Sequence, residues 1–323
     1  MPNPLTHFLL RPLGLLRRRR LHRRIAGARA LFHGDDVWYA LDQLGIPGFG
    51  TDLVRLDFPP NIGPPFAQSR SSPRSPEIEQ AIAATLPRAR ARLAAVLAHA
   101  PCRADWLDHA DPTRPTLPQW DNLFLTPVDM VTLFGMIAEL RPARYVEIGS
   151  GISTRVVHAA RAAARLATEI ISIDPAPRVE IEALCDRAVR ARLEDQIDVV
   201  RSLLQPGDVL FFDGSHRAFP GSDVTRFFLD VLPRLPAGVV VHIHDIYLPD
   251  DYPERAWDRL WSEQYLLAAW LLGGGQGLEI LLPCAELCRD PEACRLLTAV
   301  PALAGGTDAL AASSFWLRRI APG

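Results

Sequence analysis

The feature that most constrains the fold of this chain is a series of short apolar segments that alternate with helical patterns. Such alternation is typical of a parallel sheet that is covered by helices on both faces. The helical patterns cover residues 155–167, 179–186, 197–204 and a segment ending at 231. The predicted strands are residues 145–148, 169–173, 188–193, 208–212 and 239–243, followed by a late pair at 278–282 and 314–319. We therefore expect an α/β fold with a doubly wound sheet of seven strands.

Polar side chains follow the predicted strands at the points where the strands end. In open α/β sheets, ligands bind outside the carboxyl ends of the strands, where the strand order reverses. The polar residues at these ends are Asp174, Glu194, Asp195, Asp213, His216, His244 and Asp245. We therefore expect the ligand site of this protein to be assembled from them.

The segment 144–154 contains a strand, a glycine turn and the start of a helix. Gly149 and Gly151 carry no Cβ, so a ligand can lie against the main chain there. Ser153 or Thr154 can cap the free N–H groups that open the helix. A Gly-x-Gly pair also occurs in turns that bind nothing, so the other strand ends must decide what this turn does.

Glu147 and Thr154, on either side of the glycine turn, separate the candidate cofactors. A nicotinamide dinucleotide favours Gly-x-Gly-x-x-Gly, whereas the third position here is Thr154 and Glu147 lies two residues before the first glycine. A carboxylate repels a pyrophosphate and attracts the sulfonium and ammonium of S-adenosylmethionine. Asp174 follows the turn at the interval at which an acid reaches a ribose, and Glu194 or Asp195 can accept a hydrogen bond from an adenine amine. The residues favour S-adenosylmethionine.

The same segments resemble the class I S-adenosylmethionine-dependent methyltransferases, specifically the methyltransferase family 24 group. The similarity runs from about residue 120 to 319 and is carried by residues 145–154, 173–175, 212–216, 241–246, 250–253 and 314–317. It implies a Rossmann-like, mostly parallel seven-stranded sheet with an antiparallel last strand. The predicted cofactor-binding residues are Glu147, Gly149, Ser150, Gly151, Ser153, Thr154, Asp174, Glu194, Asp195, Asp213 and Gly214.

The candidate catalytic residues are Asp213, His216, His244 and Asp245, at the ends of two strands that the doubly wound topology makes neighbours. Methylation of an alcohol requires removal of its proton, by a base or with the help of a metal. Asp213 and Asp245 are the harder ligands and suit Mg²⁺ or another divalent cation. Either histidine can instead act as the base, because its pKa lies near neutral pH. In a third interpretation, these residues only bind the cofactor and end the strand.

Composition excludes several classes of enzyme. The sequence has no lysine, so all 35 basic residues are arginine. Phosphate-loop NTPases and Schiff-base enzymes both need a lysine amine and are excluded. Five cysteines without a secretory signal favour a reducing compartment, and no apolar run approaches the ~20 residues of a membrane span. We expect a soluble cytoplasmic protein.

The chain divides by composition into four parts. Residues 1–44 form a basic helical segment, rich in arginine interleaved with leucine, and 45–76 form a linker rich in Pro, Gly and Ser. Residues 77–125 are a helical and loop region that can supply a substrate wall, and 126–323 are the methyltransferase domain. The basic segment can bind an acidic surface, or it can pack on the domain or on a second subunit of a homo-oligomer.

The sequence thus predicts an S-adenosylmethionine-dependent methyltransferase that methylates oxygen on a small-molecule or sugar-like acceptor, with metal assistance as one route. Two alternatives stay open at this point. One is an oxidoreductase that uses NAD(P), which Thr154 and Glu147 disfavour. The other is a catalytically silent cofactor-binding module that uses the arginine-rich segment for interaction.

Overall fold

The computed structural model describes residues 75–177, 180–253, 256, 259–303 and 310–321. The predicted basic segment 1–44 and nearly all of the linker 45–76 lie outside the described residues. In the described part of the chain, no helix combines the length and the apolarity needed to cross a membrane.

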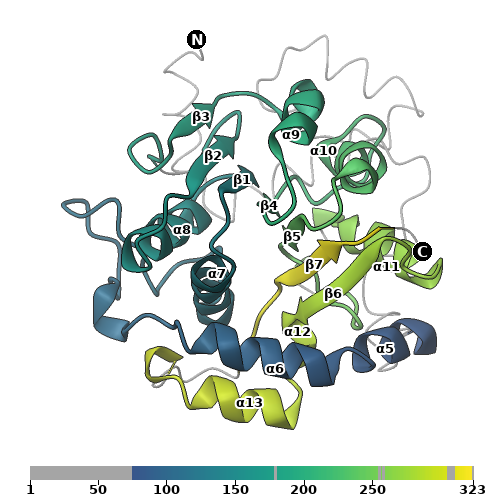
Figure 1. The fold of residues 1–323 in the computed structure, drawn as a ribbon, viewed down its shortest axis with the longest axis horizontal. Helices are drawn as coiled ribbons and strands as arrows, with labels where there is room; N and C mark the ends of the chain where they lie inside the picture. Colours follow the sequence, from purple (N-terminus) through teal and green to yellow (C-terminus); the bar gives the residue numbers. More distant parts are fainter. Residues whose placement is uncertain (1–74, 178–179, 254–255, 257–258, 304–309, 322–323) are drawn as a thin grey trace, which may run out of the picture. The chain divides into compact units, whose positions relative to one another are not determined.

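One seven-stranded sheet forms the centre of the described residues (Figure 1). Its order is β3-β2-β1-β4-β5-β7-β6, and β7 runs antiparallel to both of its neighbours. The strands are β1 (Arg144–Ile148), β2 (Glu169–Ile173), β3 (Arg187–Val189), β4 (Val209–Phe212), β5 (Val240–Ile243), β6 (Leu278–Pro283) and β7 (Phe315–Arg319). This order confirms the predicted doubly wound, mostly parallel sheet with an antiparallel last strand.

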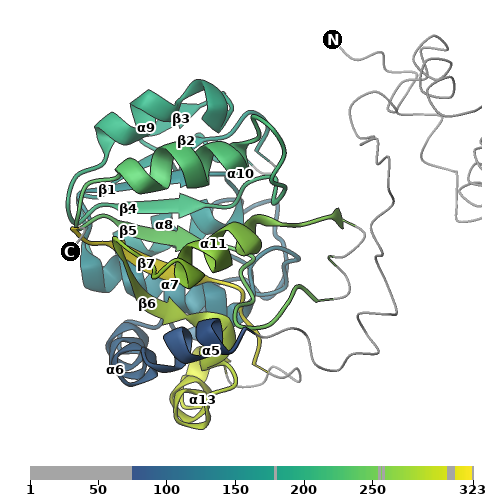
Figure 2. The ribbon, with the colours of Figure 1, turned by 90° about the vertical axis from the view of Figure 1, so that its right-hand side faces the viewer.

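Helices cover both faces of this sheet (Figure 2). The α-helices are α5 (Pro76–Ala83), α6 (Leu86–Leu97), α7 (Pro127–Leu140), α8 (Ile152–Ala163), α9 (Ile197–Leu203), α10 (Asp223–Arg226), α11 (Glu263–Leu272), α12 (Cys284–Leu287) and α13 (Pro291–Thr298). A π-helical turn, η3 (Phe227–Val231), continues α10, and short 3₁₀ turns are η1 (Arg103–Asp105), η2 (Leu193–Asp195), η4 (Leu232–Arg234) and η6 (Pro301–Leu303).

Alternate residues of the central strands fill two separate hydrophobic cores, because successive side chains of a strand point to opposite faces. Tyr145, Phe211 and Trp316 pack with residues of α6, α7, α8 and α13. Phe212 and Val241, from the opposite face, pack with residues of α5, α9, α10 and α11. Every residue of β4 and β5 is accordingly buried, which reflects the cover on both faces of the sheet.

Two predicted elements differ from those observed. Residues 180–186 form a turn where a helix was predicted, and the third strand is the short β3, so Glu194 and Asp195 lie in η2 beyond it. The carboxylate of Asp186 explains the turn: it accepts the N–H of Ile170 at 2.8 Å and pairs with Arg161 at 2.5 Å. These contacts hold the segment against β2 and α8 and leave no room for a helix to continue.

The strand order reverses between β1 and β4, where α8 and α10 pack on opposite faces. The hydrogen-bond ladder continues one residue past both strands: the N–H of Asp213 donates to the carbonyl of Ile148 at 2.9 Å, and that of Gly149 to the carbonyl of Ile173 at 3.2 Å. Gly149 has φ +83°, and a Cβ there would lie 2.0 Å from the carbonyl oxygen of Asp213. Only glycine fits this position.

Replacing Gly149 should therefore destabilise the fold more than its backbone angle alone requires. We expect Gly149→Ala to lower the free energy of unfolding by about 3 kcal/mol or more, from positive φ and from the collision with Asp213. Gly207→Ala is the matched control, because Gly207 has φ +92° with nothing within 4 Å of its added Cβ, and it should cost about 1–2 kcal/mol. Urea unfolding measures both. Equal losses for the two variants would show that the close approach to Asp213 is unimportant.

Candidate active site

The glycine turn after β1 is supported from beneath by the buried carboxylate of Glu147. The hydroxyl of Thr154 accepts the N–H of Gly151 at 3.1 Å and donates to Glu147. The hydroxyls of Ser153 and Tyr145 also donate to Glu147, at 3.1 and 3.3 Å. Glu147 is fully buried, so it supports the turn from inside the protein.

Burial raises the pKa of Glu147 to about 7, against the opposing effect of the hydroxyl donors, of which Thr154 has the largest. Desolvation disfavours the charged form of a buried carboxyl group, and hydrogen bonds to the carboxylate only partly offset this. Among the described residues at the glycine turn, Glu147 is consequently the one that gains or loses its proton near neutral pH.

Asp174, at the end of β2, is fixed against the same turn. It accepts the N–H of Ser150 at 2.8 Å and the N–H of Ala176 at 2.7 Å. Gly214 lies on the other side of the switch point, where an added Cβ would meet the carboxylate of Asp223 at 2.4 Å. Glu194 and Asp195 stand in η2, so the structure places them next to the sheet but not at a strand end.

A pocket lies at the switch point, between the glycine turn and the loop that precedes α7. Its empty space is about 340 Å³, open solvent at its mouth included. The lining residues are Phe124, Leu125, Ser150, Gly151, Ile152, Ser153 and Asp213. The pocket therefore joins three predicted cofactor-binding serine and glycine positions with the predicted catalytic residue Asp213.

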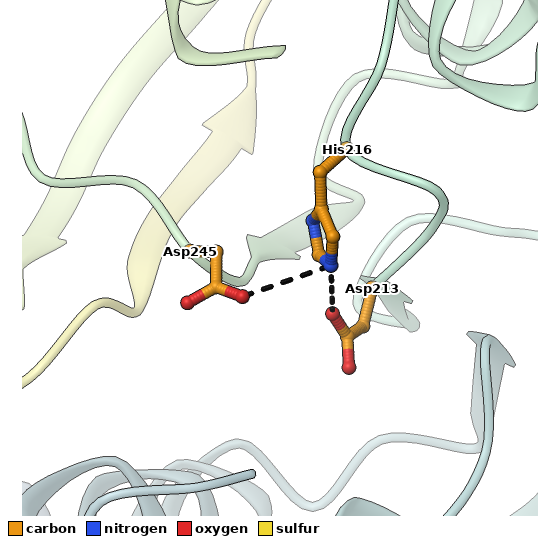
Figure 3. A group of neighbouring side chains, drawn as sticks. All are labelled: Asp213, His216 and Asp245. Carbon is orange, nitrogen blue, oxygen red and sulfur yellow. Dashed lines mark ion pairs between the residues drawn. The ribbon is translucent and has the colours of Figure 1, made fainter. Parts of the chain in front are cut away.

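Asp213, His216 and Asp245 form a compact group at the ends of β4 and β5 (Figure 3). The Nε2 atom of His216 lies 3.6 Å from Oδ1 of Asp213 and 3.7 Å from Oδ2 of Asp245. One ligand atom from each of the three residues lies within 4.8 Å of the other two. His216 and Asp245 have φ +63° and +56°, values that non-glycine residues adopt rarely, although Asp and His do so more often than most.

Glu263 orients His216, and sequence reasoning missed it. It is the first residue of α11, it is fully buried, and its Oε1 lies 2.7 Å from Nδ1 of His216. Trp261 packs its ring on the same imidazole, with centroids 4.4 Å apart. The only local signal was an acid at a helix start, a position that commonly serves the helix dipole alone.

His244 lies behind the two aspartates and contacts a second buried acid that was missed, Asp129. Its Nδ1 is 3.7 Å from Asp213 and 3.6 Å from Asp245, and its Nε2 is 3.6 Å from Asp129. Asp129 stands in the first turn of α7, where it accepts the backbone N–H groups of Ser313 and Ser314. Its spacing from Thr126 had the form of an ordinary helix cap.

Asp129, Asp213, Asp245 and Glu263 together contact the imidazoles of His216 and His244. Burial opposes protonation of His216, but Glu263, Asp213 and Asp245 outweigh it and raise the pKa to about 9. Burial likewise opposes protonation of His244, and Asp245, Asp129 and Asp213 raise its pKa well above the ordinary value. Burial likewise raises the pKa of Glu263 to about 7, against the opposing effect of His216.

The region 77–125, predicted to supply a substrate wall, contains both core residues and residues that line the pocket. Trp106 and Trp120 are buried with ring centroids 4.5 Å apart, and Trp106 also packs on Phe134. They belong to the core. The residues of this region that reach the pocket are Phe124 and Leu125.

Comparison with known proteins identifies the domain. Residues 146–246 match the family model Methyltransf_24, described as a methyltransferase domain. This match spans the glycine turn and all four predicted catalytic residues, and it confirms the resemblance inferred from the sequence. Residues 146–246 accordingly form a methyltransferase domain, and the chain is a transferase that uses S-adenosylmethionine. No curated protein matches it significantly in sequence.

Three solved structures illustrate what this chain is similar to. SAH-bound PaMTH1 from Podospora anserina has a TM-score of 0.37, 16% identity, and coverage of 59% of this chain and 78% of that one. Cofactor-bound Rv0187 from MTB has a TM-score of 0.36 and 12% identity, and the match covers 76% of this chain and 91% of that one. MycE methyltransferase in complex with Mg, SAH and mycinamycin VI has a TM-score of 0.33 and 14% identity, and the match covers 57% of this chain and 47% of that one. At these scores and identities, the likenesses add nothing to the assignment of an acceptor.

The buried Glu147 should make stability depend on pH. Its pKa is raised from 4.5 to about 7, so the folded state binds the proton more tightly than the unfolded state. The stabilisation is complete below pH 4.5 and is lost as the pH rises to 7, by about 3 kcal/mol. We expect the free energy of unfolding of the wild type, relative to Glu147→Gln, to fall by this amount across the window.

Chemical denaturation at a series of pH values measures the difference. Glu169→Gln, which removes a partly exposed carboxylate at the start of β2, is the control. A difference between wild type and Glu147→Gln that stays constant from pH 4.5 to 7 would contradict the raised pKa.

Proposed function

We propose that this protein transfers the methyl group of S-adenosylmethionine to a hydroxyl oxygen of a small-molecule or sugar-like acceptor, and that Asp213, His216 and Asp245 hold a divalent cation at the reaction site. The observation that carries the proposal is the position of Asp213. This one residue lines the pocket at the glycine turn and also belongs to the three-residue group with metal-ligand spacing. Donor and cation sites thus meet at the same side chain.

The main chain of the glycine turn is accessible to the donor. An added Cβ at Gly151 would meet nothing within 4 Å, which leaves the main chain of the turn open to a ligand. Gly149, Ser150 and Gly151 would take the amino-acid end, with Ser153 and Thr154 holding the turn in shape. Asp174, fixed by the N–H of Ser150, stands at the strand end expected to reach the ribose.

The three-residue group fits a cation by its chemistry. Two carboxylates and one imidazole suit Mn²⁺ as well as Mg²⁺, since oxygen ligands favour both and the nitrogen ligand favours Mn²⁺. The carboxylate of Glu263 binds Nδ1 of His216, so Nε2 is directed at Asp213 and Asp245. Carboxylate–histidine pairs of this kind commonly orient a metal-binding imidazole.

The reaction is an in-line displacement at the methyl carbon. The acceptor oxygen forms a bond to the methyl carbon while the carbon–sulfur bond breaks. The electron pair of the carbon–sulfur bond stays on sulfur, so the products are S-adenosylhomocysteine and the methyl ether. S-adenosylmethionine supplies the activated methyl group, and a divalent cation lowers the pKa of a nearby hydroxyl group. The residues of the chain contribute mainly by positioning, which gives large effective molarities.

The hydroxyl proton has carboxylates as its nearest acceptors. Asp213 and Asp245 face the same space, whereas each imidazole contacts acids through both of its nitrogens. This arrangement favours a role for His216 as a ligand and for His244 as a charged support beneath the aspartates. It favours less the alternative in which one histidine acts alone as the base.

Binding and turnover assays test the proposal. Calorimetry with S-adenosylmethionine, S-adenosylhomocysteine and NADH should show binding of the first two alone. Transfer of a labelled methyl group to hydroxyl-bearing acceptors should require Mg²⁺ or Mn²⁺ and should stop with EDTA. Transfer that persists undiminished in EDTA would remove the cation from the mechanism, and methylation confined to nitrogen or carbon would refute O-methylation.

The cation site should be sensitive to each of its three ligands. We expect Asp213→Asn, Asp245→Asn and His216→Gln each to weaken Mn²⁺ binding at least tenfold and to lower turnover about 100-fold or more. Electron paramagnetic resonance of free Mn²⁺ measures the affinity. Asp198→Asn, at an exposed carboxylate, is the control and should change neither quantity. Full Mn²⁺ affinity in all three variants would exclude this site.

Glu263 should act as a positioning residue for His216. Glu263→Gln keeps the size of the side chain but removes its charge, and we expect a 10- to 100-fold weaker Mn²⁺ affinity. The affinity for S-adenosylhomocysteine should remain near that of the wild type. Loss of both affinities together, with a lowered melting temperature, would show that Glu263 serves only the fold.

A further inference from the structure

We infer that Phe124 contacts the positively charged sulfonium of bound S-adenosylmethionine and that its ring makes the protein bind the charged donor more tightly than the neutral product. This inference rests on the proposed use of the pocket for the donor. It assigns a role in donor–product discrimination to a residue that lies before the methyltransferase-family match and outside the glycine turn.

The side chains that line the pocket include an aromatic ring and a carboxylate. Among its described lining residues, Phe124 is the aromatic one and Asp213 the charged one. The hydroxyls of the two serines are engaged with the protein, since Ser150 bonds to Ser172 and Ser153 donates to Glu147. An aromatic ring and a carboxylate are both attractive to a cation.

The loop before α7 holds Phe124 in place. The side-chain oxygen of Asn122 accepts the N–H of Phe124 at 3.0 Å and that of Leu125 at 2.7 Å, while its amide nitrogen donates to the carbonyl of Gln119 at 3.0 Å. Thr126 then caps α7. A turn fixed at both ends presents the residue to the pocket.

Phe124 is left half exposed by this turn. It is 46% exposed, whereas Phe134 and the phenylalanines of β4 are buried. The side chain therefore contributes less to the core than its size allows, and a ligand in the pocket would cover it. Burial of apolar surface by the ligand adds to the electrostatic attraction.

The charge of the ligand decides how much Phe124 contributes. The face of an aromatic ring attracts a cation by about 0.5–2 kcal/mol, depending on how far the pair is desolvated. S-adenosylmethionine carries the sulfonium charge and S-adenosylhomocysteine does not, although the rest of the two molecules is the same. Phe124 should thus strengthen binding of the donor selectively and favour release of the product after transfer.

Calorimetric titration of four variants with both molecules tests the inference. Phe124→Leu and Phe124→Met keep an apolar side chain without a ring, and each should weaken S-adenosylmethionine binding about 2- to 30-fold, with less than a twofold change for S-adenosylhomocysteine. Phe124→Tyr keeps the ring and should retain the wild-type ratio of the two affinities. Leu123→Ala, at the adjacent side chain that is 94% exposed, is the control and should leave both affinities unchanged.

The outcomes separate three cases. An equal loss for both molecules, or no loss for either, in Phe124→Leu and Phe124→Met overturns the inference. If one of these variants is unfolded by circular dichroism, the other together with Phe124→Tyr decides. A wild-type protein that binds neither molecule would instead refute the proposed function, and the comparison of variants would not be reached.

Discussion

The continuation of the β1–β4 hydrogen-bond ladder past the ends of the strands is the interaction on which the site depends. The N–H of Asp213 donates to the carbonyl of Ile148, and the carbonyl of Asp213 occupies the space that a side chain at Gly149 would need. Because the main chains are in contact here, the glycine turn and the end of β4 hold a fixed relative position. Asp213 belongs both to the pocket and to the three-residue group, so this contact also fixes the position of the pocket relative to that group.

A second constraint is the burial of charge around His244. Asp129 from α7, Asp213 after β4 and Asp245 after β5 meet at its imidazole, so three separate parts of the chain are joined through one ring. Isolated buried charges are unfavourable, and each of these groups is tolerated because the others are present. The cluster is therefore a structural centre that joins α7 to the ends of β4 and β5.

The sequence predicted the sheet and the strand-end residues well because these depend on local patterns, such as the apolar run 209–212 followed by Asp213. It did not reveal Asp129 or Glu263, since their partners His244 and His216 are distant in the chain and their own positions resemble ordinary helix starts. The helix predicted at 179–186 was wrong because a tertiary contact of Asp186 overrode local propensity. Which acids surround each histidine is information held by the tertiary structure alone.

The antiparallel β7 inserts between β5 and β6, although it is the last strand to be made. Ser313 and Ser314, immediately before it, supply the N–H groups that hold Asp129, and the hydroxyl of Ser313 contacts His244 and Asp245. During synthesis, the glycine turn and the acid-rich strand ends therefore leave the ribosome well before the residues that lock them. A nascent chain that stops short of this strand leaves one edge of β5 unpaired and lacks the N–H groups that hold Asp129. The charge cluster is therefore complete only after β7 has paired with β5.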